Sequence, residues 1–171
     1  MIKWLGCVLI VLSGIGFGGY FAEKIAGRVR LLEELQRDLG YLYGEIEYSA
    51  CNMPEIFEKL SKRDGALMGF WGALSGKLKD RRGCTFSEIW RMQTREMADM
   101  LSFPEEGKRL FFELGDNLGN LDRSTQLKTL KLFQKRLLPI IQNESDEYRE
   151  RKKVCYVLGV TAGLFLCILL L

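Results

Sequence analysis

The chain has 171 residues, of which 25 are Lys or Arg and 22 are Asp or Glu, giving a formal net charge of +3. This near-balance argues against a nucleic-acid-binding surface, which normally shows a strong basic excess on one face. Histidine is absent, and with it the usual general base and the commonest metal ligand, so the common routes to catalysis are closed. We expect no enzymatic activity, metal or cofactor, and a membrane enzyme or sensor that uses the charged residues of the domain is the alternative.

The first element is an uncharged stretch near the N-terminus. Trp4 to Ala22 contains 19 residues without Lys, Arg, Asp or Glu. As a helix it would be roughly 28 Å long, close to the ~30 Å hydrocarbon thickness of a bilayer. A cleaved signal peptide is the alternative, but the stretch is long and Tyr20-Phe21-Ala22 is not a small-x-small cleavage site. The sequence therefore predicts a transmembrane anchor over residues 1–22.

A long amphipathic helix is predicted directly after this anchor. Its apolar residues recur at spacings of three and four, which places them on one face. They are Leu32, Leu35, Leu39, Leu42 and Ile46. Gly40 and Gly44 weaken the helix by about 1 kcal/mol each relative to alanine. The helix is expected to end near Ser49–Asn52.

Two shorter helices are predicted next. Asn52 can cap the first of them, and Pro54 is tolerated in its first turn. Its apolar side consists of Ile56, Phe57 and Leu60. The following segment, Ala66 to Gly76, has 11 uncharged residues. It is too short to cross a bilayer and predicts a helix buried on most faces, with a third membrane insertion as the alternative.

The fourth predicted helix has clear start signals. Gly83 interrupts the chain, and Thr85 with Glu88 matches a capping box, in which each residue bonds the backbone of the other. The helix should run from Phe86 to about Leu101. Its apolar side consists of Phe86, Ile89, Trp90 and Met97.

The last two helices are predicted on either side of Gly119. Pro104 is expected in the first turn of one helix, and Gly119 should close that helix in a left-handed conformation. Asp122 starts the last helix, which Pro139 should kink. The apolar residues of the two helices are Leu110, Phe111, Leu114, Leu130, Phe133, Leu137 and either Ile140 or Ile141. The last helix can run unbroken into Val154–Leu171, an uncharged stretch of 18 residues that predicts a second transmembrane helix.

Positive charges beside the two apolar stretches predict the orientation of the chain. Lys and Arg residues concentrate on the inner side of both stretches, and only Lys3 lies outside them. The orienting residues beside the second stretch are Arg149, Arg151, Lys152 and Lys153. By the positive-inside rule, the middle of the chain is cytoplasmic and both ends face outward. We therefore predict a cytoplasmic helical domain over residues 23–153, between transmembrane segments at 1–22 and 154–171.

Each predicted transmembrane helix carries two glycines one turn apart. They are Gly14 and Gly18 in the first helix, and Gly159 and Gly163 in the second. Glycines at this spacing share one face and allow another helix to approach closely. The alternative is the ordinary glycine content of membrane helices. We predict that these faces are where the membrane helices pack.

The cysteine pattern gives little support for a disulfide framework. Of the five cysteines, only Cys51 and Cys84 lie well inside the predicted domain. They could pair with each other, but the chain lacks the cysteine density of a secreted disulfide scaffold. We expect small buried thiols in a reducing compartment.

The fold class follows from the periodicity. No segment alternates between apolar and polar residues over the length of a strand. The predicted fold is all-α, a compact bundle of about six helices flanked by an N-terminal and a C-terminal transmembrane helix.

Three landmarks in the sequence resemble one known family. The first is the string LGDNLGNLDRSTQ, whose key residues are Leu114, Gly115, Leu118, Gly119, Asp122 and Gln126. The others are Gly83–Trp90 and Glu45–Ser49, the latter followed by Met53-Pro54-Glu55. Together with the apolar ends and the length, they resemble the stage III sporulation protein AB family over essentially the whole chain. Leu121 departs from the pattern, where a polar residue is expected.

The resemblance implies a function that composition and spacing do not. The family is similar in fold to a cytoplasmic six-helix domain of the inner-membrane platform proteins of type II secretion and type IV pilus machines. It implies a non-enzymatic adaptor in the mother-cell membrane, within the channel complex between mother cell and forespore. The implied partners are the lipid bilayer, a cytoplasmic secretion-type ATPase and other membrane subunits of the complex. A platform protein of a vegetative secretion or pilus-like machine is the alternative.

Overall fold

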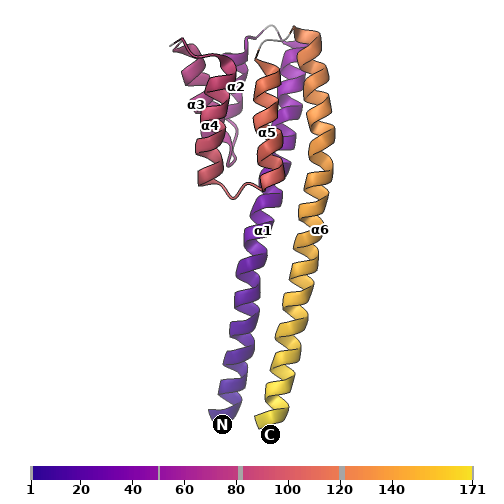
Figure 1. Cartoon of the computed structure of the whole chain (residues 1–171). Coiled ribbons are helices and arrows are strands. Elements are labelled where there is room, and N and C mark those ends of the chain that lie inside the picture. Colours follow the sequence, from indigo (N-terminus) through magenta and orange to yellow (C-terminus); the bar gives the residue numbers. More distant parts are fainter. Residues whose placement is uncertain (1, 50, 81–82, 120–121, 171) are drawn as a thin grey trace. The chain divides into compact units, whose positions relative to one another are not determined.

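The computed structural model of the chain describes residues 2–49, 51–80, 83–119 and 122–170, with most side chains between residues 26 and 154. In these residues the fold is all-α, as predicted, with six helices and no strand (Figure 1). The helices are α1 (Ile2–Tyr48), α2 (Met53–Ser61), α3 (Met68–Lys79), α4 (Phe86–Met100), α5 (Glu105–Leu118) and α6 (Arg123–Leu170).

The two predicted transmembrane segments form the beginning of α1 and the end of α6 rather than separate helices. Most of their side chains lie outside the described residues. Among the residues that are described, no helix offers a stretch that is both long and apolar enough to cross a membrane. The two spans therefore stay predictions.

The chain divides into two compact units. One is Arg30–Ile141, and the other combines Met1–Val29 with Gln142–Leu171. In the second unit, the Arg28 guanidinium lies 3.9 Å from the Glu144 carboxylate, and Arg151 pairs with Glu147 at 2.5 Å. Both units draw on α1 and α6, so each of these helices continues from one unit into the other.

The core of the Arg30–Ile141 unit combines a leucine-rich face of α1 with an aromatic cluster. All five predicted core positions of α1, from Leu32 to Ile46, are buried. The aromatic cluster comes from α2 to α5 and consists of Phe57, Phe70, Trp71, Phe86, Trp90 and Phe111. Its rings pack at centroid distances between 4.9 and 6.3 Å. On α6, Leu130, Phe133, Leu137 and Ile140 complete the core, as predicted.

The predicted helix starts are confirmed where a local side chain makes the cap. Asn52 and Glu55 form a capping box at α2, and Thr85 and Glu88 form another at α4. Pro104 lies one residue earlier than expected, as the N-cap of α5. Gly83 has a φ of +75°, a left-handed conformation that favours glycine and explains the break before α4.

Helix α3 is less buried than predicted. Only one side of it, Phe70, Trp71, Leu74 and Ser75, faces the core. Met68 is 52% exposed, and the small residues Gly69 and Ala73 also face solvent. The absence of charge misled the prediction, because small residues such as glycine and alanine lower the polarity of a segment without requiring burial.

One smaller prediction also fails in the structure. The expected burial of both thiols is wrong for Cys84, which is exposed, while Cys51 is half-buried and both are free. Cys51 and Cys84 therefore form no disulfide with each other. Pro139 lies inside α6, which continues past it to Leu170, as the sequence analysis allowed, and the kink expected at Pro139 stays a prediction.

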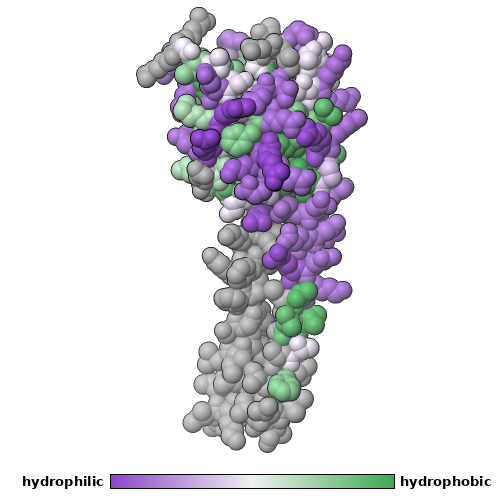
Figure 2. Space-filling view, in the orientation of Figure 1, coloured by the Kyte–Doolittle hydropathy of each residue, from purple (hydrophilic) through white to green (hydrophobic). Residues whose placement is uncertain are grey.

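The surface of the Arg30–Ile141 unit is mainly hydrophilic on the face in Figure 2, with hydrophobic residues in small separate patches. Much of its charge is organised in ion pairs. Glu58 binds both Lys62 and Lys79, Arg91 binds Asp116, and Arg136 binds Glu113. The two lysines hold the pKa of the Glu58 carboxyl down at about 2.

Candidate functional site

The residues of the predicted family signature gather where α4, α5 and the start of α6 meet. Leu114 and Leu118 are buried on α5. Gly115 lies between them and faces the indole of Trp90 on α4. A Cβ on Gly115 would lie 1.9 Å from Trp90 Cδ1, far inside van der Waals contact. The absence of a side chain at Gly115 is therefore what lets the two helices approach each other.

A hydrogen bond and an aromatic contact, both with Phe111 on α5, fix the orientation of the Trp90 side chain. The indole is fully buried, and its Nε1 donates a hydrogen bond of 2.9 Å to the backbone carbonyl of Phe111 on α5. A buried indole N–H without a partner would cost free energy, so this bond selects one orientation of the ring. The Trp90–Phe111 centroid distance of 4.9 Å adds an aromatic contact to the same pair of helices.

Gly119 has a different role from the one predicted. Its φ of −68° and ψ of −30° are right-handed, so the left-handed helix end is wrong. A Cβ on Gly119 would lie 3.0 Å from Phe86 Cδ1 and 3.3 Å from Ser87 Oγ. Gly115 and Gly119 are four residues apart and thus lie on one face of α5, where they receive two aromatic side chains of α4.

Asp122 begins α6 as predicted. Its carboxylate accepts hydrogen bonds from the backbone N–H of Ser124 at 3.1 Å and of Thr125 at 3.3 Å, and from both hydroxyl groups at 2.6 Å. These bonds stabilise the charged form and lower the pKa of Asp122 to about 2. The carboxylate satisfies donors that the first turn of a helix leaves without intrahelical partners.

Gln126 and Arg123, in the first turn of α6, form hydrogen bonds with the C-terminal ends of two other helices. Gln126 Nε2 donates to the carbonyl of Leu118 in the last turn of α5, at 3.2 Å. Arg123 Nε donates to the carbonyl of Ile46 at 2.6 Å, and its Nη2 donates to that of Glu47. The first turn of α6 therefore caps the last turns of both α5 and α1, which would otherwise leave carbonyls unsatisfied.

Sequence reasoning found Gln126 through the family signature but missed Arg123. The only signal for Arg123 was a basic residue directly after the helix start, where the macrodipole disfavours positive charge. That position is explained by the carbonyls of α1, which lie 76 and 77 residues away in the sequence. Only a tertiary contact could show this.

A second polar contact, also missed by sequence reasoning, attaches α3 to α1. Glu34 accepts hydrogen bonds from the backbone N–H of Ala66 at 3.0 Å and of Leu67 at 2.7 Å. Leu67 is the N-cap of α3 and has no capping side chain of its own. A Cβ on Gly65 would lie 2.2 Å from Glu34 Oε1, so Gly65 leaves the space that the carboxylate occupies.

Asp38 lies one turn further along α1 and is buried. Trp71 Nε1 donates to Asp38 Oδ2 at 2.6 Å. Burial raises the pKa of the Asp38 carboxyl above its ordinary value, although the bond from Trp71 lowers it. A buried carboxyl can mark a catalytic acid, but here its hydrogen bond goes to a core indole that itself packs against Phe57.

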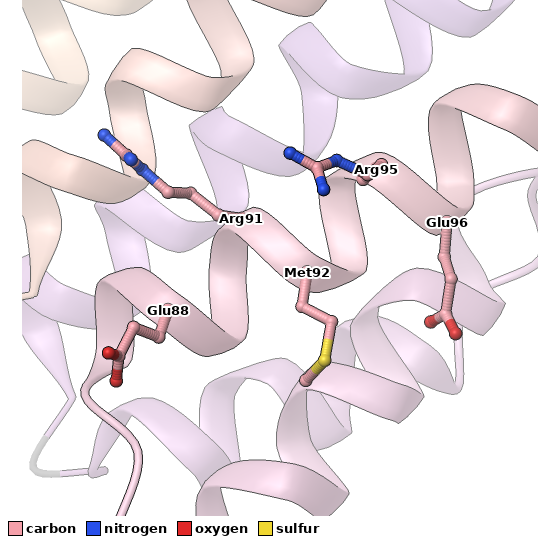
Figure 3. Close-up of a pocket in the computed structure, with 5 residues that line it drawn as sticks. All are labelled: Glu88, Arg91, Met92, Arg95 and Glu96. Atoms are coloured by element: carbon pink, nitrogen blue, oxygen red, sulfur yellow. The ribbon is translucent and has the colours of Figure 1, made fainter.

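A shallow hollow lies on the outer side of α4 (Figure 3). It has a volume of about 420 Å³ and is lined by Glu88, Arg91, Met92, Arg95 and Glu96. Glu88 caps α4, and Arg91 forms a bidentate pair with Asp116 at 2.6 and 2.7 Å. Figure 3 shows the five side chains spread along one helix rather than converging on a point. This arrangement suits contact with another surface better than binding of a small molecule.

Among the described residues, Lys59 is the basic group that lies beside a thiol. Lys59 Nζ lies 2.6 Å from Glu45 Oε2 and 3.3 Å from Cys51 Sγ. The bond to Glu45 is the largest influence raising the pKa of the Lys59 ammonium, and a charged ammonium is a poor base and nucleophile. Within the described residues, no cluster of three Cys, Asp or Glu side chains could hold a metal ion.

The predicted membrane-associated residues are only partly described. Gly14, Gly18, Gly159 and Gly163 lie in α1 and α6, but their surroundings are outside the described residues. The orienting residues Arg149, Arg151, Lys152 and Lys153 are exposed on α6. Lys152 lies 5.8 Å from the centre of the Tyr148 ring. The packing and orienting roles stay predictions.

Comparisons with known proteins agree on one family. The family model described as stage III sporulation protein AB matches residues 3–171. Stage III sporulation protein AB of Bacillus subtilis (strain 168) is 26% identical over 172 residues, with 100% of both chains covered. A solved structure of stage III sporulation protein AB (SpoIIIAB) is similar with a TM-score of 0.66 and 21% identity. It covers 72% of this chain and 97% of that chain, and at this identity it supports the fold alone.

Proposed function

Because the chain belongs to the stage III sporulation protein AB family, we propose that it is a non-enzymatic platform protein of the endospore-forming cell. In this proposal it forms part of the channel complex between mother cell and forespore. The observation that carries the proposal is the family match over nearly the full chain, together with a curated relative that aligns end to end. The names of these relatives favour sporulation over a vegetative secretion or pilus-like machine.

The proposed mechanism is mechanical coupling. The helical unit Arg30–Ile141 would bind a cytoplasmic secretion-type ATPase, and the two apolar ends would anchor the chain in the mother-cell membrane beside other subunits of the complex. The internal construction of the unit supports such a role. Side chains from one helix cap or lock the ends of others, as Arg123, Gln126 and Glu34 do. A unit joined in this way can transmit force without losing its packing.

The coupling proposal is tested by co-purification. The full-length chain with an affinity tag is isolated in detergent from membranes of sporulating cells, and the ATPase is quantified in the eluate. A tagged, unrelated protein with two membrane spans is the control. We expect enrichment of the ATPase over this control. Recovery equal to the control would contradict the coupling role.

The proposed orientation has a built-in reporter, because Cys84 is exposed. A membrane-impermeant thiol reagent is added to intact cells and, separately, to permeabilised cells. If Arg30–Ile141 is cytoplasmic, Cys84 should be labelled only after permeabilisation, and a Cys84→Ser variant supplies the background. Equal labelling in intact cells would contradict the two-span orientation.

A further inference from the structure

The outer side of α6 within the Arg30–Ile141 unit carries three lysines that form no ion pair with a described residue. Residues 123–141 contain five basic residues and no acidic residue. Arg123 and Arg136 have partners inside the unit. Lys128, Lys131 and Lys135 are exposed and form no ion pair with any described residue. Their charges are therefore available to another molecule.

The three lysines share one helix face with two exposed leucines. Lys128, Lys131, Lys135 and Leu138 follow one another at spacings of three, four and three residues, which aligns them along α6. Leu132 lies one turn after Lys128. Leu132 is 54% exposed and Leu138 is 47% exposed. We define Lys128, Lys131, Leu132, Lys135 and Leu138 as the lysine–leucine face.

Several lysines and arginines elsewhere in the unit have acidic partners within the chain, as in Lys59–Glu45, Lys79–Glu58 and Arg91–Asp116. Single exposed leucines are ordinary on a protein surface. On this face the three lysines form the middle row and the two leucines flank it, so a partner would meet a row of positive charge bordered by apolar side chains.

We propose that the lysine–leucine face of α6 is a docking surface for a partner protein whose contacting surface is acidic and presents apolar hollows to the two leucines. Charge complementarity selects this occupant, because an acidic surface would supply the carboxylates that the chain itself does not place near the three lysines. The inference rests on the proposed platform function only for its setting, the assembled complex. The identity of the acidic partner is not fixed by that function.

An anionic membrane is the competing occupant, and the burial pattern disfavours it. A helix that lies in a membrane interface needs a wide apolar face to insert, usually rich in large or aromatic side chains. The apolar face of α6 is already used, because Leu130, Phe133 and Leu137 are buried in the core. The outward side then has only Leu132 and Leu138 to offer the lipid.

The test is site-specific photo-cross-linking of the full-length chain in sporulating cells. A photoreactive phenylalanine derivative replaces Leu132, which keeps the position apolar, and the cross-linked peptides are identified by mass spectrometry. The same derivative at Met92, an exposed residue on α4, is the matched control. The Leu132 adduct should join a protein segment with an excess of Asp and Glu, and the Met92 adduct should not join that segment.

Charge variants decide whether the lysines carry the contact. The combined variant K128E/K131E/K135E should lower the Leu132 adduct by about tenfold or more, and K128R/K131R/K135R should leave it unchanged. Replacing the contacted Asp and Glu residues of the partner by Lys should restore the adduct in the glutamate variant. If the glutamate variant folds poorly, photo-cross-linking of the wild-type chain in a lysate of the same cells at raised ionic strength replaces it, and the higher salt should reduce the adduct.

Other outcomes would overturn the proposal. They are adducts with phospholipid alone, adducts with a second copy of this chain, a partner segment without acidic excess, and an adduct that charge reversal leaves unchanged. The outcome is separable from that of the platform function. If the ATPase still co-purifies with the glutamate variant while the Leu132 adduct is unaffected, only the docking surface is wrong. If the ATPase never co-purifies but the charge dependence holds, only the coupling role is wrong.

Discussion

Helices α3 and α5 are attached to their neighbours by opposite means. Helix α5 packs closely against α4 because Gly115 and Gly119 have no side chain and leave room for Trp90 and Phe86. Helix α3 meets α1 through added polar groups, because Glu34 caps its first amides and Asp38 accepts from Trp71. The α4–α5 contact therefore depends on shape, and the α1–α3 contact depends on hydrogen bonds and protonation. The two contacts should fail under different perturbations.

The largest effect is expected at Gly115. In Gly115→Ala the new Cβ would lie 1.9 Å from Trp90 Cδ1, so α4 and α5 must separate or the indole must leave its site. Overpacking of this kind costs about 3 kcal/mol, which outweighs the ~1 kcal/mol that alanine gains in helix propensity. The free energy of unfolding in urea measures the change.

Gly44→Ala on α1 is the matched control for this substitution. A Cβ there meets no other atom within 4 Å, so only the propensity gain of about 1 kcal/mol should remain. The two alanine variants should therefore shift the unfolding free energy in opposite directions. A shift of the same sign in both would contradict the steric role of Gly115.

The next largest effect is expected at Glu34. Glu34→Ala removes the acceptor for the amides of Ala66 and Leu67, and loss of a helix cap costs about 1–2 kcal/mol. Glu33→Ala, the exposed neighbour on α1, should change stability by no more than about 0.5 kcal/mol. Urea unfolding gives both values, and hydrogen exchange should accelerate at Ala66 and Leu67 only in the Glu34 variant. Equal effects of the two substitutions would show that Glu34 does not cap α3.

The contribution of Asp38 should depend on pH, with a sign set by its raised pKa. The folded carboxyl holds its proton more tightly than the unfolded one, whose pKa is near 3.8. Its stabilising effect is therefore complete below that value and is lost as the pH rises through the folded pKa. Asp38→Asn cannot titrate, so the stability of the wild type relative to this variant should fall as the pH rises above about 4. Parallel pH profiles in urea unfolding would contradict this account.

The smallest effect is expected at Gly119. Because its backbone is right-handed, alanine is free of the αL penalty of about 1–2 kcal/mol, and the contact of 3.0 Å with Phe86 requires only a small adjustment. Gly119→Ala should change the unfolding free energy by less than about 1 kcal/mol, as the entropy gain and the strain offset each other. A cost well above 1 kcal/mol would support the left-handed helix end instead.

Local sequence patterns predicted the helices well. The α1 stripe from Leu32 to Ile46 and the capping box of Thr85 and Glu88 depend on residues within one or two turns of each other. Such signals are readable in sequence because helix periodicity and capping are short-range. The same reasoning failed for Ala66–Gly76, since a lack of charge does not reveal which side of a helix is covered.

The candidate site was predicted as a set of positions but not as a set of contacts. The family signature identified Gly115, Gly119, Asp122 and Gln126, and the capping role of Asp122 followed from its position before α6. The role assigned to Gly119 was wrong, because a glycine favours both a left-handed turn and a close helix contact. Distinguishing the two requires the position of Phe86, which lies 33 residues earlier in the chain.

The sequence by itself determined the all-α fold, the helix starts, the buried faces of α1 and α6, and the family to which the chain belongs. Only the tertiary structure decided that Gly115 receives Trp90, that Glu34 caps α3, and that Arg123 caps α1. It also decided that Lys128, Lys131 and Lys135 of α6 form no ion pair with a described residue. The physical reason is range: a helix is set by neighbours three or four residues away, whereas these contacts join side chains that meet only after the helices have packed.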